Sequence, residues 1–118
     1  MPELPVIDPA TIENLRALSP DDNGEFLKEI SEMFLSDTPQ RIAELEQSMA
    51  TGDGTRFTRA AHSIKGSSAN LGATALQEAA ARLEHDSRQA PLPTLQPLVD
   101  SLKGEFERAK TELRKLTA

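Results

Sequence analysis

Apolar residues recur every three or four positions in the last quarter of the chain, and this spacing constrains the fold more than any other feature. Residues at such intervals lie on one side of an α-helix. A long helix that is apolar on one side needs partners to cover that side, so we expect a helical bundle. We also expect Thr94 to cap the start of this helix. The series comprises Leu95, Leu98, Val99, Leu102, Phe106, Ala109, Leu113 and Leu116.

Helix start and stop signals divide the first half of the chain into further segments. Asp8-Pro9 predicts the start of a short helix, and Ser19-Pro20 predicts its end. Helical spacing predicts another segment over about 22–36, and Thr38-Pro39 begins one more. A proline at this place is compatible with two separate helices or with one kinked helix, and both interpretations stay open. The apolar side of the first short helix carries Ile12, Leu15 and Leu18.

The second half of the chain has equally clear boundaries. Gly52 predicts the end of one helix and Asp53 the N-cap of the next, which continues to about Leu71 before Gly72. A further helix is expected over about 74–87. The predicted fold is therefore all-α. We expect one domain over 1–118, with a short N-terminal helix in 1–20 and an antiparallel four-helix bundle over about 22–116.

Composition and charge limit the classes of function. The 118 residues contain no Cys, Trp or Tyr. The absence of Cys excludes disulfides, thiol chemistry and Cys-based zinc sites. The formal net charge of -6 disfavours binding to nucleic acids and to anionic membranes. No apolar run approaches the roughly 20 residues that span a bilayer. The acidic start of the chain lacks a signal peptide's basic residues, so we expect a cytoplasmic protein.

The helix expected over 53–71 carries the most informative residue. On a helical wheel His62 lies opposite the apolar side and faces solvent, with Arg59, Lys65, Gly66 and Ala69 beside it. A neutral imidazole, whose ordinary pKa is about 6.5, is a competent nucleophile. The predicted buried side comprises Phe57, Ala60, Ile64, Ser68 and Leu71.

The neighbours of His62 suggest why it is exposed. Gly66 stands four residues later and therefore directly beside the ring. Glycine costs a helix about 1 kcal/mol relative to alanine, so its presence suggests a position kept bare for an approaching surface. Lys65 places a cation where it can meet phosphate charge. We expect loss of the Lys65 side chain to leave folding unaffected.

The stretch Ala61-His62-Ser63-Ile64-Lys65-Gly66-Ser67-Ser68-Ala69-Asn70-Leu71-Gly72-Ala73 resembles the signature of histidine-containing phosphotransfer domains of bacterial phosphorelays. The resemblance implies that His62 is the phosphoacceptor, through Nε2. It further implies that Lys65 stabilises phosphoryl charge and that Gly66 leaves room for a docking receiver domain, with Arg59 and Ala69 also at the interface. Ser67 occupies the family's serine position, which we interpret as packing or a backbone hydrogen bond.

The same resemblance implies the partners. We expect receiver domains of a hybrid histidine kinase and of a response regulator, with Mg²⁺ supplied by the receiver and no cofactor or ATP-dependent kinase activity in this chain. A monomer is expected, because dimerisation risks covering the docking surface. In relatives a polar side chain on the neighbouring helix often hydrogen-bonds the imidazole. The candidates here are Gln77, Ala81, Glu84 and His85, and the sequence does not choose among them.

Two alternatives stay open at this point. One is a non-catalytic helical adaptor that binds receiver or kinase domains. The other is the terminal phosphotransfer domain of a hybrid sensor kinase, although Met1 and the nearly complete helix set favour a free-standing protein. A structural or surface role is expected for His85, near the end of its helix.

Overall fold

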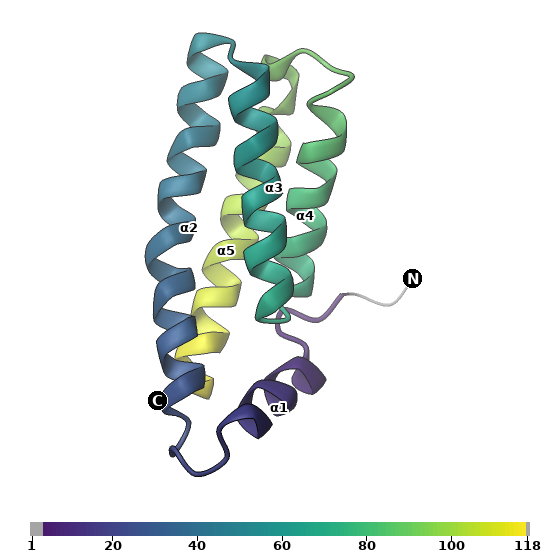
Figure 1. Ribbon diagram of the computed structural model, residues 1–118. Helices are drawn as coiled ribbons and strands as arrows, with labels where there is room; N and C mark the ends of the chain where they lie inside the picture. Colours follow the sequence, from purple (N-terminus) through teal and green to yellow (C-terminus); the bar gives the residue numbers. More distant parts are fainter. Residues whose placement is uncertain (1–3, 118) are drawn as a thin grey trace.

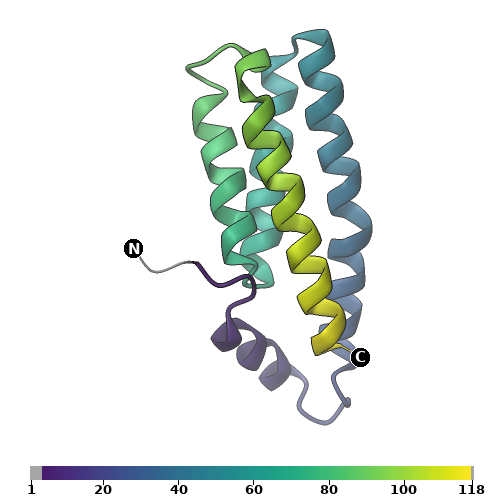
Figure 2. The same cartoon turned by 180° about the vertical axis from the view of Figure 1, so that it is seen from behind.

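The computed structural model describes residues 4–117 and is built of α-helices, without a strand in that range. Four long helices lie side by side in an elongated bundle, and the short α1 lies across one end (Figures 1 and 2). The expected all-α fold is therefore confirmed. No helix within residues 4–117 is long and apolar enough to cross a membrane. The elements are α1 (Pro9–Leu18), α2 (Glu25–Thr51), α3 (Gly54–Asn70), α4 (Thr74–Asp86), a 3₁₀ turn (Leu92–Leu95) and α5 (Gln96–Leu116).

Helix α2 resolves the question that Pro39 left open, because it runs without a break from Glu25 to Thr51. Proline has no N–H, so the helix lacks one hydrogen bond at this point. On the exposed side the Gln40 side chain donates to the Ser36 carbonyl, at 3.4 Å. On the inner side Thr38 is buried, which keeps this part of the helix packed against the core. Packing against the core thus keeps α2 helical across Pro39, although a proline often ends a helix.

The turn between α2 and α3 follows the sequence prediction. Gly52 adopts a left-handed conformation with φ of 74°, and its N–H donates to the Ser48 carbonyl. Asp53 then caps α3, since its carboxylate accepts from the Arg56 backbone N–H at 3.1 Å. This tight turn makes α2 and α3 antiparallel neighbours.

The turn between α3 and α4 is held by the N-terminal segment. Gly72 has a φ of 70°, and a Cβ at this position would lie 2.7 Å from the Thr11 Cβ. The Asp8 N–H donates to the Gly72 carbonyl at 2.7 Å, and the Ala75 N–H donates to the Pro5 carbonyl at 3.2 Å. Asp8 also caps α1 as expected. The N-terminal segment therefore fixes the turn that sets α4 beside α3.

Two details of the sequence prediction are wrong. Thr94 does not cap α5, because it lies inside the 3₁₀ turn, where its hydroxyl donates to the Pro91 carbonyl at 2.6 Å. Burial of Leu92 and Leu95 favours this extra turn, and α5 begins only at Gln96. Leu18 is 68% exposed instead of lying on a buried side of α1, whose buried residue is Ile12.

The core runs along the axis of the bundle and is dominated by aliphatic side chains, as the composition predicts. Helix α3 lies between α2 and α4, so it buries one side and leaves a narrow strip open to solvent (Figure 1). The tilted ring pair of Phe34 and Phe106, with centroids 5.9 Å apart, joins α2 to α5. The core residues most completely buried include Leu27, Leu45, Phe57, Ile64, Leu76, Leu83, Val99, Leu102 and Leu113.

Candidate functional site

The two sides of α3 are as the helical wheel predicts. Its buried residues are Phe57, Ala60, Ala61, Ile64 and Ser68, and Leu71 is buried just beyond its end. The His62 side chain is 65% exposed. This histidine therefore contributes little to the core and presents its ring to solvent, which makes it available to another protein.

One ring nitrogen of His62 is held by α4. The Nδ1 atom lies 2.8 Å from Oε2 of Glu84, which is one of the four residues that the sequence left as candidates. Glu84 belongs to the part of α4 that packs against α3, and only 8% of its surface is exposed. A carboxylate in such a place needs partners, because burial disfavours its charged form.

Three cationic or titratable groups surround the Glu84 carboxylate. The Lys65 ammonium donates to Oε1, and Nη2 of Arg88 lies 3.6 Å from Oε2, the oxygen that His62 also contacts. We call these four residues the Glu84 cluster. The hydrogen bond from Lys65 is the largest influence that holds the pKa of the Glu84 carboxyl below its usual value, and it outweighs the opposing effect of burial. Glu84 is therefore a carboxylate at neutral pH.

The charge of Glu84 fixes the tautomer of a neutral His62 ring. A carboxylate can only accept hydrogen bonds, so Nδ1 must carry the proton. The Nε2 atom then holds the free lone pair and is the nucleophilic nitrogen. The arrangement leaves the reactive atom on the side of the ring away from Glu84.

Lys65 differs from its expected state. Its side chain is 34% exposed and is engaged by Glu84, so it is not a free cation on an open surface. Removing one partner of a fully buried pair costs about 3–5 kcal/mol, whereas an exposed pair contributes roughly 0–1 kcal/mol. The half-buried Lys65 lies between these limits. The expectation that its loss leaves folding unaffected is therefore revised.

The surface of α3 that follows His62 along the helix is bare, as Gly66 predicts. A Cβ built on Gly66 meets no atom within 4 Å outside its own helix. Ala69 is exposed on the same strip. The Ser67 hydroxyl instead donates to the backbone carbonyls of Ser63 and Ile64, at 3.1 and 3.3 Å, as its wheel position suggested.

A shallow hollow opens beside His62 towards the start of α3. Arg59 reaches it from α3 and Arg88 from the turn after α4, and a hydrogen bond of 2.7 Å between the Thr58 and Ser87 hydroxyls joins α3 to the C-cap of α4 there. Within residues 4–117, Glu84 is the only acidic residue among those that line it. We call this feature the His62 hollow; it is lined by Gly54, Thr55, Thr58, Arg59, His62, Glu84, Ser87 and Arg88.

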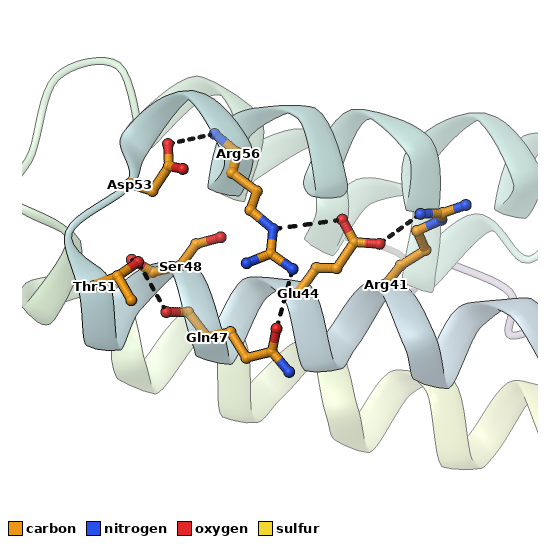
Figure 3. Close-up of polar contacts among 7 residues, drawn as sticks. All are labelled: Arg41, Glu44, Gln47, Ser48, Thr51, Asp53 and Arg56. Atoms are coloured by element: carbon orange, nitrogen blue, oxygen red, sulfur yellow. Dashed lines mark hydrogen bonds and ion pairs between the residues drawn. The ribbon is translucent and has the colours of Figure 1, made fainter.

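A second polar cluster lies between α2 and α3, on the side of α3 away from Glu84 (Figure 3). Arg41 donates to Glu44, Nε of Arg56 lies 4.0 Å from the same carboxylate, and Nη2 of Arg56 donates to Gln47 at 3.0 Å. We call these four residues the Glu44 cluster. It contains no histidine.

The second histidine of the chain lies outside the site. His85 is exposed, and its Nδ1 lies 3.1 Å from Asp86 on the same helix. Among the described residues its side chain bonds to Asp86 and Gln89 and not to His62 or Glu84, and it does not line the His62 hollow. The expected surface role of His85 agrees with this position.

The sequence model of the Hpt domain matches residues 29–112, which includes α3, α4 and the Glu84 cluster. The chain belongs to the Hpt domain family. The family, the helical fold and a general role in histidine phosphotransfer are thereby confirmed.

Individual relatives place this Hpt domain in context. Multistep phosphorelay regulator 1 of Schizosaccharomyces pombe is 29% identical over 80 residues, which make up 68% of this chain and 27% of that protein. The chain thus spans about a quarter of the length of this curated relative. Similar Hpt sequences can evidently be parts of much larger proteins.

Two solved structures share the fold of this Hpt domain. Histidine-containing phosphotransfer protein B from Pseudomonas aeruginosa PAO1 superposes with a TM-score of 0.83 at 24% identity, covering 98% of this chain and 96% of that one. The HPT domain of a sensor hybrid histidine kinase from Shewanella gives 0.72 at 17% identity, covering 97% and 95%. At these identities the likeness concerns the fold.

Sequence reasoning missed one member of the site and left another undecided. Glu84 was one of four candidates, because the choice depends on how α4 is rotated against α3. Arg88 was not considered. Its position four residues after Glu84 was the available signal, since residues at this interval are neighbours on a helix.

Proposed function

We propose that His62 accepts a phosphoryl group on Nε2 from the phosphoaspartate of a receiver domain and passes it to the aspartate of a second receiver. The observation that carries the proposal is the contact of 2.8 Å between Nδ1 of the exposed His62 and the nearly buried Glu84. It directs the lone pair of the neutral ring to Nε2. Without such a partner, a neutral imidazole would be a mixture of two tautomers, with the proton on one ring nitrogen or the other.

The transfer step can be written with these groups. The Nε2 lone pair attacks phosphorus, an Nε2–P bond forms, and the O–P bond to the aspartate breaks with the electron pair leaving on the carboxylate. The ring, still protonated at Nδ1, gains positive charge as the bond forms. Glu84 lies against that proton and stabilises the charge. In the second transfer the same steps run in reverse towards another aspartate.

Phosphoryl transfer depends mainly on alignment and on stabilisation of charge. Lys65, Arg59 and Arg88 give the surroundings of His62 a positive character although the whole chain carries -6. The bare strip of Gly66 and Ala69 admits a partner surface. We assign Mg²⁺ to the receiver and expect no ATP-dependent kinase activity in this chain. An open docking strip also favours a monomer.

The partners follow from this chemistry. The donor is expected to be the receiver domain of a hybrid histidine kinase and the acceptor that of a response regulator. The proposal applies equally to a free-standing protein and to a domain within a hybrid kinase, because the site lies wholly within α3, α4 and the turn after α4.

The test is to mix the protein with a ³²P-labelled receiver domain and to follow the label. We expect acid-labile, alkali-stable labelling of the wild-type chain and of His85→Gln, and none of His62→Gln. His85 is a matched control, since it is the other histidine of the chain and is exposed to a similar degree, with side-chain exposures of 68% and 65%. A label that persists in His62→Gln would refute the proposal. Binding of the receiver without labelling of the wild type would indicate an adaptor instead.

A further inference from the structure

The cations near His62 differ in their contacts, which points to different roles for them, and this inference rests on the proposed function. We propose that Arg59 and Arg88 carry the positive charge that meets the phosphoryl group on His62. Lys65 acts instead through Glu84 as a positioning residue. The family resemblance implies that Lys65 stabilises the phosphoryl charge. We assign this role instead to Arg59 and Arg88, the two arginines of the His62 hollow.

The first argument concerns Lys65. Its ammonium already donates to Oε1 of Glu84, a carboxylate with only 10% of its side chain exposed. Glu84 thus offsets part of the Lys65 charge, and although an ammonium has further N–H donors, moving it out towards a phosphoryl group would weaken this contact. The carboxylate would then lose its principal partner in a poorly hydrated place, which is unfavourable. Lys65 therefore holds Glu84 in position, and Glu84 in turn orients the His62 ring.

The second argument concerns Arg59. It stands three residues before His62 and therefore beside the ring on α3, and it lines the His62 hollow. Among residues 4–117, Arg59 takes part in no ion pair. Its guanidinium can thus turn towards a phosphoryl group without losing a carboxylate partner.

The third argument concerns Arg88. Its Nη2 lies 3.6 Å from Oε2 of Glu84, which is longer than a hydrogen bond, and its side chain is 64% exposed. The same oxygen lies 2.8 Å from Nδ1 of His62, so the guanidinium is held close to the ring by a weak contact. Guanidinium groups also match phosphate oxygens with two parallel hydrogen bonds, which an ammonium cannot do.

Phosphoramidate provides a test without a receiver. In this reaction an Nε2–P bond forms at His62 while the N–P bond of N-protonated phosphoramidate breaks, and its electron pair leaves on nitrogen as neutral ammonia. The rate of labelling is measured by ³¹P NMR at about 0.15 M salt, where distant exposed charges are largely screened, across a range of pH. The variants are Arg59→Gln/Arg88→Gln, Lys65→Met and the charge-matched control Arg82→Gln/Arg108→Gln, whose residues line a groove between α4 and α5 instead. Circular dichroism checks that each variant is folded.

We expect the Arg59→Gln/Arg88→Gln variant to lose at least about tenfold in the plateau rate, the size expected when a hydrogen bond to a charged group is lost. The control should stay within about twofold of wild type, since its charges lie outside the hollow. Lys65→Met should lose less of the plateau rate than Arg59→Gln/Arg88→Gln and should move the rate profile to higher pH, because Glu84 then stabilises a protonated ring more strongly. The charged groups that bear on the ring in this profile are Glu84 on α4, Arg88 in the turn after α4, and Arg59 and Lys65 on α3.

The reverse pattern would overturn the inference. A plateau lowered tenfold in Lys65→Met, with Arg59→Gln/Arg88→Gln equal to the control, would make Lys65 the charge donor. Failure of the proposed function is a different result, because neither phosphoramidate nor a phosphorylated receiver would then label His62 in the wild type.

Discussion

Glu44 and Glu84 occupy similar settings on the two sides of α3, yet they differ in burial and in the kind of partner that they bind. Each carboxylate attracts basic side chains from two segments of the chain, Arg41 and Arg56 for Glu44, and Lys65 and Arg88 for Glu84. The Glu44 side chain is 28% exposed, whereas that of Glu84 is 10% exposed. The more buried carboxylate depends more strongly on its partners.

The partners differ in kind as well as in burial. In the Glu44 cluster all the cations are arginines, and the carboxylate raises the pKa of Arg41, a group that is already charged at any physiological pH (Figure 3). The Glu84 cluster includes an imidazole, whose protonation and nucleophilicity respond to a neighbouring charge. The comparison teaches that an interhelical ion pair gains chemical significance when one of its members can react.

The largest difference between the clusters is expected in transfer rate. Glu84→Gln should slow phosphorylation of His62 by a receiver about tenfold to a hundredfold, because the charged acceptor that orients Nδ1–H and stabilises the ring is lost. Glu44→Gln should change the rate by less than about twofold, because the contacts of Glu44 are with Arg41 and Arg56 and not with His62. Rapid-quench measurements with one labelled receiver compare the two variants. Equal rates in both would remove the functional distinction between the clusters.

Stability should separate the clusters by a smaller margin. Lys65→Met is expected to lower the free energy of unfolding by about 1–2 kcal/mol, below the range for a fully buried pair because Lys65 is partly solvated. Arg56→Met should cost no more than about 0.5–1 kcal/mol, because its ion pair with Glu44, at 4.0 Å, is longer and more exposed than that of Lys65 with Glu84. Urea denaturation at neutral pH gives both values. A larger loss for Arg56→Met would indicate that the Glu44 cluster is the main structural ion pair.

Acid should weaken the contribution of Glu84 in a predictable direction. The folded protein holds the pKa of Glu84 below the ordinary value of 4.5. The resulting stabilisation is fully present above that value and disappears as the pH falls through the lower, folded-state pKa. The stability difference between wild type and Glu84→Gln should therefore shrink below about pH 4.5. Denaturation curves from pH 7 to pH 3 would reveal a constant difference if Glu84 did not titrate in this way.

The smallest expected effect concerns the bare position beside the Glu84 cluster. Gly66→Ala should raise the free energy of unfolding by up to about 1 kcal/mol, because alanine favours helix and its Cβ meets no neighbour. Gly104→Ala in α5 is a matched control with equally open surroundings and should give a similar gain. Only Gly66→Ala is expected to slow transfer from a receiver, and modestly. Equal transfer rates in both variants would mean that the partner does not approach this position.

Much of this arrangement could be predicted from the sequence, because it depends on local periodicity. The exposed position of His62 follows from the apolar residues around it on one helix, and the turns at Gly52 and Gly72 follow from glycine's access to positive φ. The bundle itself follows from four segments that each have one apolar side.

The parts that could not be predicted depend on contacts between helices. Glu84 was not separable from Gln77, Ala81 and His85, since the rotation of α4 is set by packing and by the contact of Thr11 with Gly72. Thr94 misled the prediction because a capping residue is equally suited to a 3₁₀ turn, and burial of two leucines decided between them. Pro39 lies within α2 because its neighbours pack well enough to compensate for one missing hydrogen bond.

The N-terminal segment that crosses the α3–α4 turn also determines where this domain can be tethered. The described chain enters near that turn and leaves at the end of α5, and both points lie in the half of the bundle where α1 packs (Figures 1 and 2). The His62 hollow extends the other way, towards Gly54 and Ser87 at the opposite end. A linker that continues from either described end would therefore start in the half of the bundle away from the His62 hollow. A longer polypeptide can be attached at these points without the attachment lying on the hollow.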